Sequence, residues 1–306
     1  MTTKFTFYKL FGALFTVLFG LLAAVPAAQA TGVNNLKAIG LTQDGVLVRF
    51  NTGSPRKTEN IEIISFQGGG DTSLIGIDFR VQDGLLYGVG NFGGLYTINP
   101  KTAVATFQNY TLTPAPQGSF FGVDFNPAAN ALRVVSDISQ NLRVPFSVNN
   151  VNVNKPQPTV DDSNPPSGPR PLTYAALVPP VTATGISAAA YTNNDLVATT
   201  GTTLFDIDPA NVSPATDPQN VVVIQSPANG GSVVTTGSLG VDAGPQAGFD
   251  IFSQLRKGVT VSNTAFASLF VDEGYRLYNI NLLTGSAKLV GAFDDQVVDL
   301  AIQLKQ

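Results

Sequence analysis

Residues 74–110 read LIGIDFRVQDGLLYGVGNFGGLYTINPKTAVATFQNY, and this stretch decides the fold. Short runs rich in Leu, Ile, Val, Tyr and Phe alternate in it with Gly, Asn, Asp and Pro, a pattern typical of short strands and tight turns. It predicts strands at 74–79, 85–89, 95–99 and 104–110. The turns Gln82-Asp83-Gly84 and Asn91-Phe92-Gly93 supply the positive φ angles that short hairpins need. Four antiparallel strands joined in this way make one blade of a β-propeller.

Two motifs from this stretch recur along the chain. Gly76-Ile77-Asp78-Phe79 returns at 122–125 and 248–251, more weakly at 298–300, and without its acid at 189–191. Leu95-Tyr96-Thr97-Ile98-Asn99 returns at 47–51, 204–208 and 277–281, with a fainter copy at 142–146. Because the two motifs alternate, further copies of the unit are predicted at 120–153, 186–224 and 247–292. The copy at 186–224 is extended by a strand or two within 232–241.

One unit is divided between the two ends of the chain. Residues 36–66 hold three strands without an innermost one, and 297–303 is an unpartnered copy of an innermost strand. Joining these segments closes the ring and removes exposed strand edges. The sequence therefore predicts an all-β propeller of four-stranded antiparallel blades, a single domain over residues 31–306. Five blades are favoured, and six are the alternative if 149–183 or 230–245 forms a blade.

Residues 149–183 differ from the rest of the chain in composition, because they contain eight prolines. Proline has no N–H to donate to a sheet, so this segment is predicted to be a long surface loop. It is a candidate for ligand binding on a rigid scaffold, and an excursion without a ligand is the favoured interpretation.

The first 30 residues have the features of a secretory signal peptide. Lys4 and Lys9 precede an uncharged run from Leu10 to Val25, and Ala28-Gln29-Ala30 is a small-x-small cleavage site. The uncharged run is shorter than the roughly 20 residues that span a bilayer. We expect cleavage after Ala30 and a monomeric secreted or periplasmic protein with no membrane span.

The composition excludes several kinds of chemistry. The chain has no cysteine and no histidine, which rules out disulfides, thiolate nucleophiles, imidazole bases and Cys/His zinc sites. The formal net charge is −4, and it becomes −6 without the leader, since 15 basic residues then face 21 acidic ones. Such a surface repels phosphate backbones, so no nucleic-acid partner is expected.

Several motifs, taken in order, resemble one known bacterial family. They are Gly76-Ile77-Asp78-Phe79, Leu95-Tyr96-Thr97-Ile98-Asn99-Pro100, Gly122-Val123-Asp124-Phe125-Asn126-Pro127, Leu132-Arg133-Val134-Val135-Ser136, Ala190-Tyr191-Thr192-Asn193, Thr203-Leu204-Phe205-Asp206-Ile207-Asp208 and Gly248-Phe249-Asp250-Ile251. Together they resemble the exported domain of unknown function 4394 family over roughly residues 36–303. The resemblance implies an exported propeller-type repeat protein, and it implies no reaction and no site residue. Some relatives carry a C-terminal sorting helix, and since this sequence ends at Gln306 without one, release rather than anchoring is expected.

The repeated acids Asp78, Asp124, Asp250 and Asp299 are the candidate site. On innermost strands, four carboxylates would encircle the central channel, where they could hold a cation or form an acid pair of the kind that glycosidases use. In the structural interpretation, each carboxylate instead accepts backbone N–H groups of its own or the next blade. Recurrence once per blade favours this interpretation, because a catalytic pair needs two acids in unlike environments. No catalytic, cofactor-binding or metal residue is predicted, and the four acids remain channel candidates.

Three further groups of residues have both a functional and a structural interpretation. Asp161-Asp162 and Asp294-Asp295 lack the spacing of a calcium loop and are predicted to lie in solvated turns. Arg133 and Arg143, near Asp137, could hold a carboxylate ligand, but a surface ion pair is favoured. Tyrosines on the strand repeats could form a sugar-stacking surface, but packing between blades is favoured. They are Tyr87, Tyr96, Tyr191 and Tyr278.

Two classes of function remain. The favoured one is an exported, non-enzymatic propeller that needs no cofactor and binds, or serves as a scaffold for, an unknown extracellular ligand or protein. The alternative is a carboxylate-based hydrolase or lyase acting on an extracellular polysaccharide or a lactone.

Overall fold

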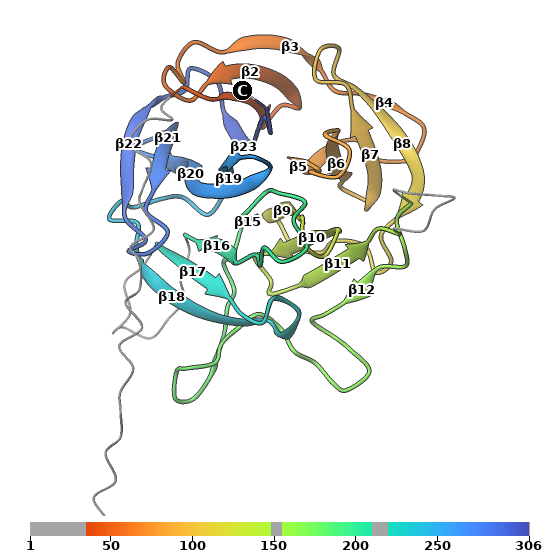
Figure 1. Cartoon of the computed structure of the whole chain (residues 1–306), viewed down its shortest axis with the longest axis vertical. Helices are drawn as coiled ribbons and strands as arrows, with labels where there is room; N and C mark the ends of the chain where they lie inside the picture. Colours follow the sequence, from red (N-terminus) through yellow and green to blue (C-terminus); the bar gives the residue numbers. More distant parts are fainter. Residues whose placement is uncertain (1–34, 148–154, 210–219, 306) are drawn as a thin grey trace, which may run out of the picture.

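The chain folds into five small sheets arranged in a ring, which is a five-bladed β-propeller (Figure 1). The computed structural model describes residues 35–147, 155–209 and 220–305, so the expected signal peptide lies outside the described residues. Within those ranges the helical structure is one short 3-10 turn, η1 (Ala228–Gly230). No helix in the described part of the chain is long and apolar enough to cross a bilayer.

Blade 1 closes the ring with strands from both ends of the chain. From the channel outward its strands are β23 (Val297–Ile302), β1 (Lys37–Thr42), β2 (Val46–Asn51) and β3 (Glu59–Ile63). β23 and β1 pair antiparallel, with Ala38 opposite Ile302 and Leu41 opposite Asp299. The predicted closure by the C-terminal strand is confirmed.

Blade 2 is the unit on which the prediction was built. Its strands are β5 (Leu74–Phe79), β6 (Leu86–Gly90), β7 (Gly94–Ile98) and β8 (Val104–Thr111), with β4 (Ser65–Gln67) added parallel to β8 at the outer edge. The order of the four main strands is the predicted one.

Blades 3 and 4 absorb the segments that could have formed a sixth blade. Blade 3 consists of β9 (Phe121–Asn126), β10 (Ala131–Ser136), β11 (Asn141–Pro145) and β12 (Val160–Asp161). Blade 4 consists of β15 (Ala188–Tyr191), β16 (Leu204–Asp208), β17 (Val221–Gln225), β18 (Ser232–Ser238), β13 (Thr173–Tyr174) and β14 (Val181–Thr182). The six-blade alternative is therefore wrong. The outer strand of blade 3 lies inside the proline-rich segment and beyond the predicted end of that unit at residue 153.

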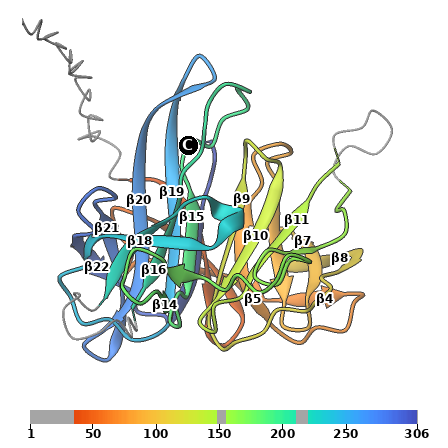
Figure 2. The ribbon, with the colours of Figure 1, turned by 90° about the horizontal axis from the view of Figure 1, so that it is seen from below.

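Blade 5 contains the longest strands of the molecule. It is built from β19 (Ala247–Arg256), β20 (Val259–Val271), β21 (Gly274–Ile280) and β22 (Ala287–Ala292). The β19–β20 hairpin rises above the plane of the ring beside the segment that joins β15 to β16 (Figure 2).

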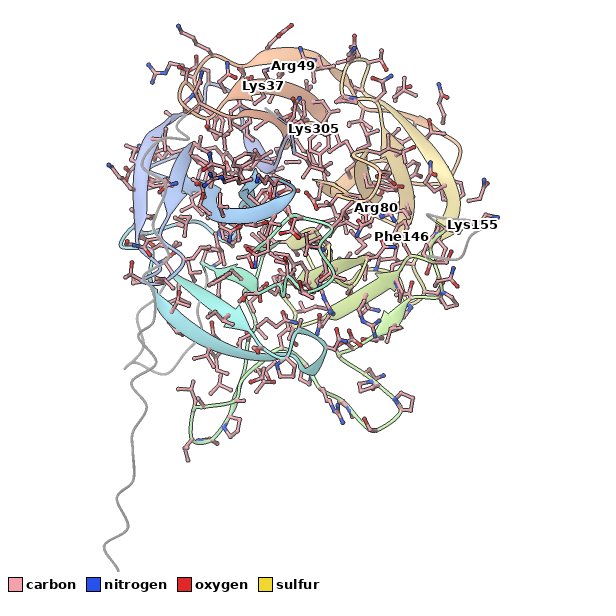
Figure 3. All side chains as sticks on the ribbon, viewed as in Figure 1. Lys37, Arg49, Arg80, Phe146, Lys155 and Lys305 are labelled. Carbon is pink, nitrogen blue, oxygen red and sulfur yellow. The ribbon has the colours of Figure 1, made fainter. Side chains whose placement is uncertain are left out.

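The hydrophobic core consists of wedges between neighbouring blades. Each of four clusters of buried side chains draws its members from adjacent blades. Between blades 2 and 3, Tyr87, Phe125 and Phe146 pack edge to face, and the Arg80 guanidinium lies 4.6 Å from the centre of the Phe146 ring (Figure 3). Burial of this apolar and aromatic surface is the main stabilising term and needs no disulfide.

The innermost strands approach one another closely, and this explains the glycine of the repeated Gly-x-Asp motif. A Cβ added to Gly122 would lie 2.5 Å from the backbone nitrogen of Ala189 in the next blade. One added to Gly248 would lie 2.6 Å from the Cα of Asp299. Larger side chains here would force the inner strands apart.

Candidate functional site

The innermost strands carry the four candidate acids to the central channel. β5 holds Asp78, β9 holds Asp124, β19 holds Asp250 and β23 holds Asp299. The first three side chains are buried, and Asp299 is partly buried. The blade 4 strand β15 has Ala190 at the corresponding position, so the ring of acids is interrupted there.

Each acid accepts a hydrogen bond from the backbone of the next inner strand in the ring. The four N–H donors are Phe125 to Asp78 (2.8 Å), Tyr191 to Asp124 (3.0 Å), Ile302 to Asp250 (2.5 Å) and Ile77 to Asp299 (2.8 Å). These bonds link blade 5 to 1, 1 to 2, 2 to 3 and 3 to 4. The junction between blades 4 and 5 lacks such a carboxylate because Ala190 occupies the position.

Three of the acids also bind the N–H of the residue that follows them. Phe79 donates to Asp78 at 2.6 Å, Ile251 to Asp250 at 2.5 Å and Leu300 to Asp299 at 2.9 Å. Both oxygens of these three carboxylates are thus engaged by backbone donors. These bonds satisfy N–H groups that burial would otherwise leave without partners.

Asp299 does not stand level with the other three acids. The N–H that Asp250 binds belongs to Ile302, which therefore takes the place that Phe125 and Tyr191 take in their blades. Ala301 is then the residue aligned with Asp124, and Asp299 lies two residues earlier on the same face of its strand. The expected alignment of Val298-Asp299-Leu300 with the Asp78 motif is wrong by two residues.

The other three acids form a compact cluster. Asp78, Asp124 and Asp250 each place an oxygen within 4.8 Å of the others, close enough to hold a metal ion between them. Burial raises the pKa of Asp78 and Asp124 well above the usual value, and the charges of neighbouring acids raise it further. Burial also raises the pKa of Asp250 to about 7, against the N–H bonds from Ile302 and Ile251. Chemically, this cluster can share protons or bind a cation.

Asp299 borders an open pocket at one mouth of the channel. The pocket has a volume of about 320 Å³, and its walls include Leu74, Phe121, Ala247 and Val298, at the beginnings of the four inner strands. Burial raises the pKa of Asp299 to about 8, while the N–H bonds from Ile77 and Leu300 oppose the shift. A pKa of about 8 favours the protonated form of this carboxyl at neutral pH, and the carboxyl borders a cavity that a small molecule could enter.

The comparisons with known proteins identify a family and no activity. Residues 46–301 match the model of the family described as Domain of unknown function (DUF4394). The chain belongs to the DUF4394 family. No curated protein matches it.

Solved structures resemble the DUF4394 chain only distantly. An auxiliary nutrient binding protein from Bacteroides thetaiotaomicron has 13% identity and a TM-score of 0.38, over 77% of this chain and 56% of that one. A protein from Lactobacillus plantarum has 11% identity and a TM-score of 0.40, over 88% and 99%. A putative 6-phosphogluconolactonase from Bacteroides fragilis has 9% identity and a TM-score of 0.38, over 89% and 99%. The chain spans little more than half of the first of these, and similarities this distant carry no argument about function.

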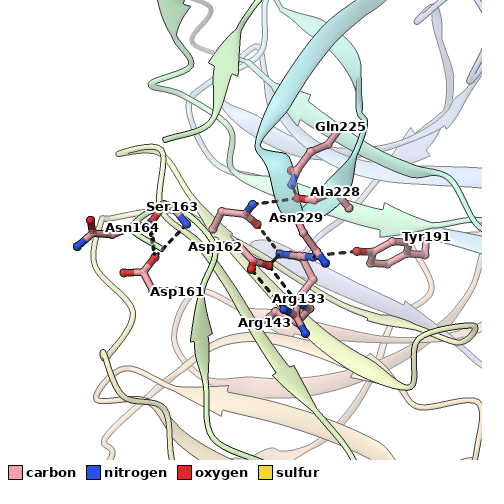
Figure 4. A network of polar contacts seen from close by, with 11 residues as sticks. Arg133, Arg143, Asp161, Asp162, Ser163, Asn164, Tyr191, Gln225, Ala228 and Asn229 are labelled. Atoms are coloured by element: carbon pink, nitrogen blue, oxygen red, sulfur yellow. Dashed lines mark hydrogen bonds and ion pairs between the residues drawn. The ribbon is translucent and has the colours of Figure 1, made fainter. Parts of the chain in front are cut away.

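The paired arginines differ most from the sequence expectation. Arg133 is buried and donates to Asp162 at 2.8 Å, and Arg143 donates to the same oxygen at 3.1 Å (Figure 4). The predicted surface ion pair near Asp137 is wrong, because both arginines reach the proline-rich segment instead. The predicted solvated turn is also wrong for Asp162, whose side chain is 7% exposed. Asp161 ends β12, and its side chain accepts the N–H groups of Ser163 and Asn164 in the turn that follows.

The strand tyrosines and the Asp294-Asp295 pair lie in the DUF4394 fold where the sequence predicted them. The prediction of packing is confirmed, because all four tyrosines of the strand repeats are buried between blades: Tyr87, Tyr96, Tyr191 and Tyr278. Asp294 makes an exposed ion pair with Arg56 at 3.3 Å, and Asp295 accepts the Thr58 hydroxyl, as expected of a surface turn.

Sequence reasoning missed Asp206, a fully buried acid on β16. Neither of its oxygens has a hydrogen-bond partner. Burial raises its pKa well above the usual value, although the charge of Arg133 opposes the shift. The repeat does mark this residue, because Leu204-Phe205-Asp206-Ile207-Asp208 has acids at the positions where the 95–99 copy has Thr97 and Asn99.

Proposed function

We propose that this chain is an exported, non-enzymatic propeller that binds a small extracellular ligand, and that its channel acids hold the blades together. The observation that carries the proposal is the set of carboxylate to N–H bonds between successive inner strands. A carboxylate whose two oxygens bind backbone donors is poorly placed to bind and activate a substrate. The ligand-binding part of the proposal is supported by the open pockets between and beside the blades.

The environments of the clustered acids support the same conclusion. Asp78, Asp124 and Asp250 are all buried, and in all three the pKa is raised chiefly by burial. Acid and base catalysis by two carboxyls requires environments that drive their pKa values apart. Export and a monomeric state complete the proposal, and both are supported by the sequence features of residues 1–30 and by a ring that closes within one chain.

A second candidate function rests on Asp299. A carboxyl with a pKa of about 8 beside a 320 Å³ pocket is suited to act as a general acid. A hydrolase or lyase acting on an extracellular polysaccharide or a lactone would use this carboxyl to protonate a leaving group. The backbone bonds to both of its oxygens count against that role.

The experiment that separates the two functions uses each Asp→Asn variant of the four channel acids, with Asp294→Asn as an exposed control. Thermal stability, turnover on polysaccharides and lactones, and retention on an array of extracellular glycans are measured for the protein cleaved after Ala30. We expect retention without turnover, and altered stability for the channel variants alone. Turnover that Asp299→Asn abolishes at unchanged stability would overturn the non-enzymatic proposal and establish the second candidate.

A further inference from the structure

A second pocket lies between blades 3 and 4, at the opposite ends of the inner strands from the channel-mouth pocket. Its volume is about 260 Å³, and Asn126 and Tyr191, the last residues of β9 and β15, line it. Arg133, Arg143 and Asn229 also line it. We call it the blade 3–4 cleft. Its volume is just below the range of about 300 to 1,000 Å³ typical of ligand pockets, so the ligand it suits is small.

The cleft is built around a buried arginine. Arg133 donates to Tyr191 Oη at 3.3 Å, to Asn141 Oδ1 at 2.7 Å, to Asp162 Oδ2 at 2.8 Å and to Asn229 Oδ1 at 2.5 Å (Figure 4). The side chain is only 2% exposed. These bonds hold the guanidinium in one orientation at the base of the cleft, which is the preorganisation that selective anion binding requires.

The second arginine leaves donors available. Arg143 gives its Nε and one terminal nitrogen to Asp162, and its side chain is 24% exposed. A guanidinium has five N–H donors in a rigid fork. The remaining donors of Arg143 are on the side chain that faces the cleft, and Asp162 shows that a carboxylate fits against these two arginines.

The neutral groups of the cleft also offer donors. Asn126 Oδ1 accepts the Ala129 N–H and the Thr202 hydroxyl, and the Asn126 amide also hydrogen-bonds the Tyr191 hydroxyl, which leaves one of its two N–H groups as a donor. Asn229 Oδ1 accepts Arg133, so its NH₂ group remains as a donor. The hydroxyl of Tyr191 accepts Arg133, and its own proton remains to be donated. The rest of the wall is apolar and consists of Ala129, Ala131, Leu132, Pro227 and Ala228.

The charge of the cleft is positive on an acidic protein. Two guanidiniums face the single carboxylate of Asp162. Burial raises the pKa of the nearby Asp206 well above its usual value, and the charge of Arg133 opposes the shift. The two guanidiniums thus exceed the carboxylate that they share by one positive charge, although the formal net charge of the chain is −4.

We propose that the blade 3–4 cleft binds the carboxylate of a small sugar acid, such as a hexuronate. The free donors of Arg143 bind the carboxylate, and the amides of Asn126 and Asn229 bind ring hydroxyls. The inference rests on the proposed function as a binding protein and names its site and ligand class. It is independent of whether the channel acids catalyse a reaction.

The test is isothermal titration of the full protein cleaved after Ala30 with D-galacturonate, D-galactose and inorganic phosphate. Galactose keeps the ring and lacks the carboxylate, and phosphate tests for unselective anion binding. We expect galacturonate to bind at least about tenfold more tightly than either, the difference expected for a charge-assisted bidentate contact. Equal binding of galactose or of phosphate, or no binding of galacturonate, would overturn the proposal.

Two variants and a control locate the binding. Arg143→Gln removes the charge, and Asn126→Asp keeps the oxygen that accepts Ala129 and Thr202 but adds a negative charge beside the cleft. Each should weaken galacturonate binding about tenfold or more. Arg276→Gln is the matched control, because Arg276 is similarly exposed at 28% and makes an ion pair with Asp272 in blade 5. Unchanged binding in either folded cleft variant, or an equal loss in the control, would place the ligand elsewhere. If the protein neither binds galacturonate nor turns over any substrate tested, the cleft proposal fails while the non-enzymatic function still stands.

Discussion

Replacement of Asp250 tests the role of the channel acids most directly. Its two oxygens accept the N–H groups of Ile251 and Ile302, both at 2.5 Å. Asp250→Ala leaves both buried donors without a partner, at about 1 to 3 kcal/mol each. We therefore expect a loss of about 2 to 6 kcal/mol, a large part of a typical stability of about 5 to 15 kcal/mol. Asp250→Asn keeps one acceptor and should lose about half as much at acidic pH.

The two variants should differ from wild type in their pH dependence. The pKa of Asp250 is raised from 3.8 to about 7, so the folded protein binds more protons than the unfolded chain between these values. Its contribution to stability is therefore greatest at acidic pH and is lost progressively as the pH rises toward 7. The change between about pH 5 and about pH 8 amounts to about 2 to 3 kcal/mol. Asparagine does not titrate, so the stability of Asp250→Asn relative to wild type should rise by this amount between the two pH values.

Urea unfolding at the two pH values measures these differences, with Asp294→Asn as the control for loss of an exposed charge. A constant difference between Asp250→Asn and wild type across the interval would refute the raised pKa. An Asp250→Ala variant as stable as Asp250→Asn at about pH 5 would refute the argument that this carboxylate satisfies buried N–H groups.

Three further predictions concern ring closure, the acid cluster and export. Deleting residues 296–306 removes β23 and exposes the inner edge of blade 1, so the truncated protein should lose several kcal/mol of its free energy of unfolding or fail to fold. Thermal unfolding monitored by circular dichroism tests this, and a cooperative transition near the full-length melting temperature would contradict the split blade. If protons rather than a cation neutralise Asp78, Asp124 and Asp250, EDTA and millimolar Ca²⁺ should leave the melting temperature unchanged, and a calcium-dependent rise in calorimetry would show that the cluster binds metal. N-terminal sequencing of exported protein should begin at Thr31, and a start that retains Leu10 to Val25 would disprove cleavage after Ala30.

The sequence predicted the fold well because blade structure is locally encoded. Turn residues at 82–84 and 91–93 and the strand runs between them are read directly from the chain, and their recurrence favours five blades over six. The short strands β12, β13 and β14 escaped prediction because they lie in a proline-rich segment. Their pairing depends on sheet edges supplied by β11 and β18, which are distant in the sequence from some of these partners.

The candidate site was predicted only in part, for a related reason. The repeated acids identified the inner strands, but the two-residue offset of Asp299 appears only in the bond from Ile302 to Asp250. Nothing in the residues around Asp162 indicates burial, because its partners Arg133 and Arg143 come from the preceding blade strands. A burial environment made by three separate segments has no local pattern to detect.

By itself the sequence determined most of the strands, the repeated four-stranded blade and the need to join the two ends of the chain. These follow from hydrophobic alternation, turn chemistry and repetition, which act between residues close in the chain. Only the tertiary structure decided which acids meet in the channel, that Asp299 stands apart beside a pocket, and that two arginines share Asp162. Those arrangements depend on the packing of blades against one another, where a shift of two residues along a strand keeps the hydrophobic pattern but moves a charge to a different level of the channel.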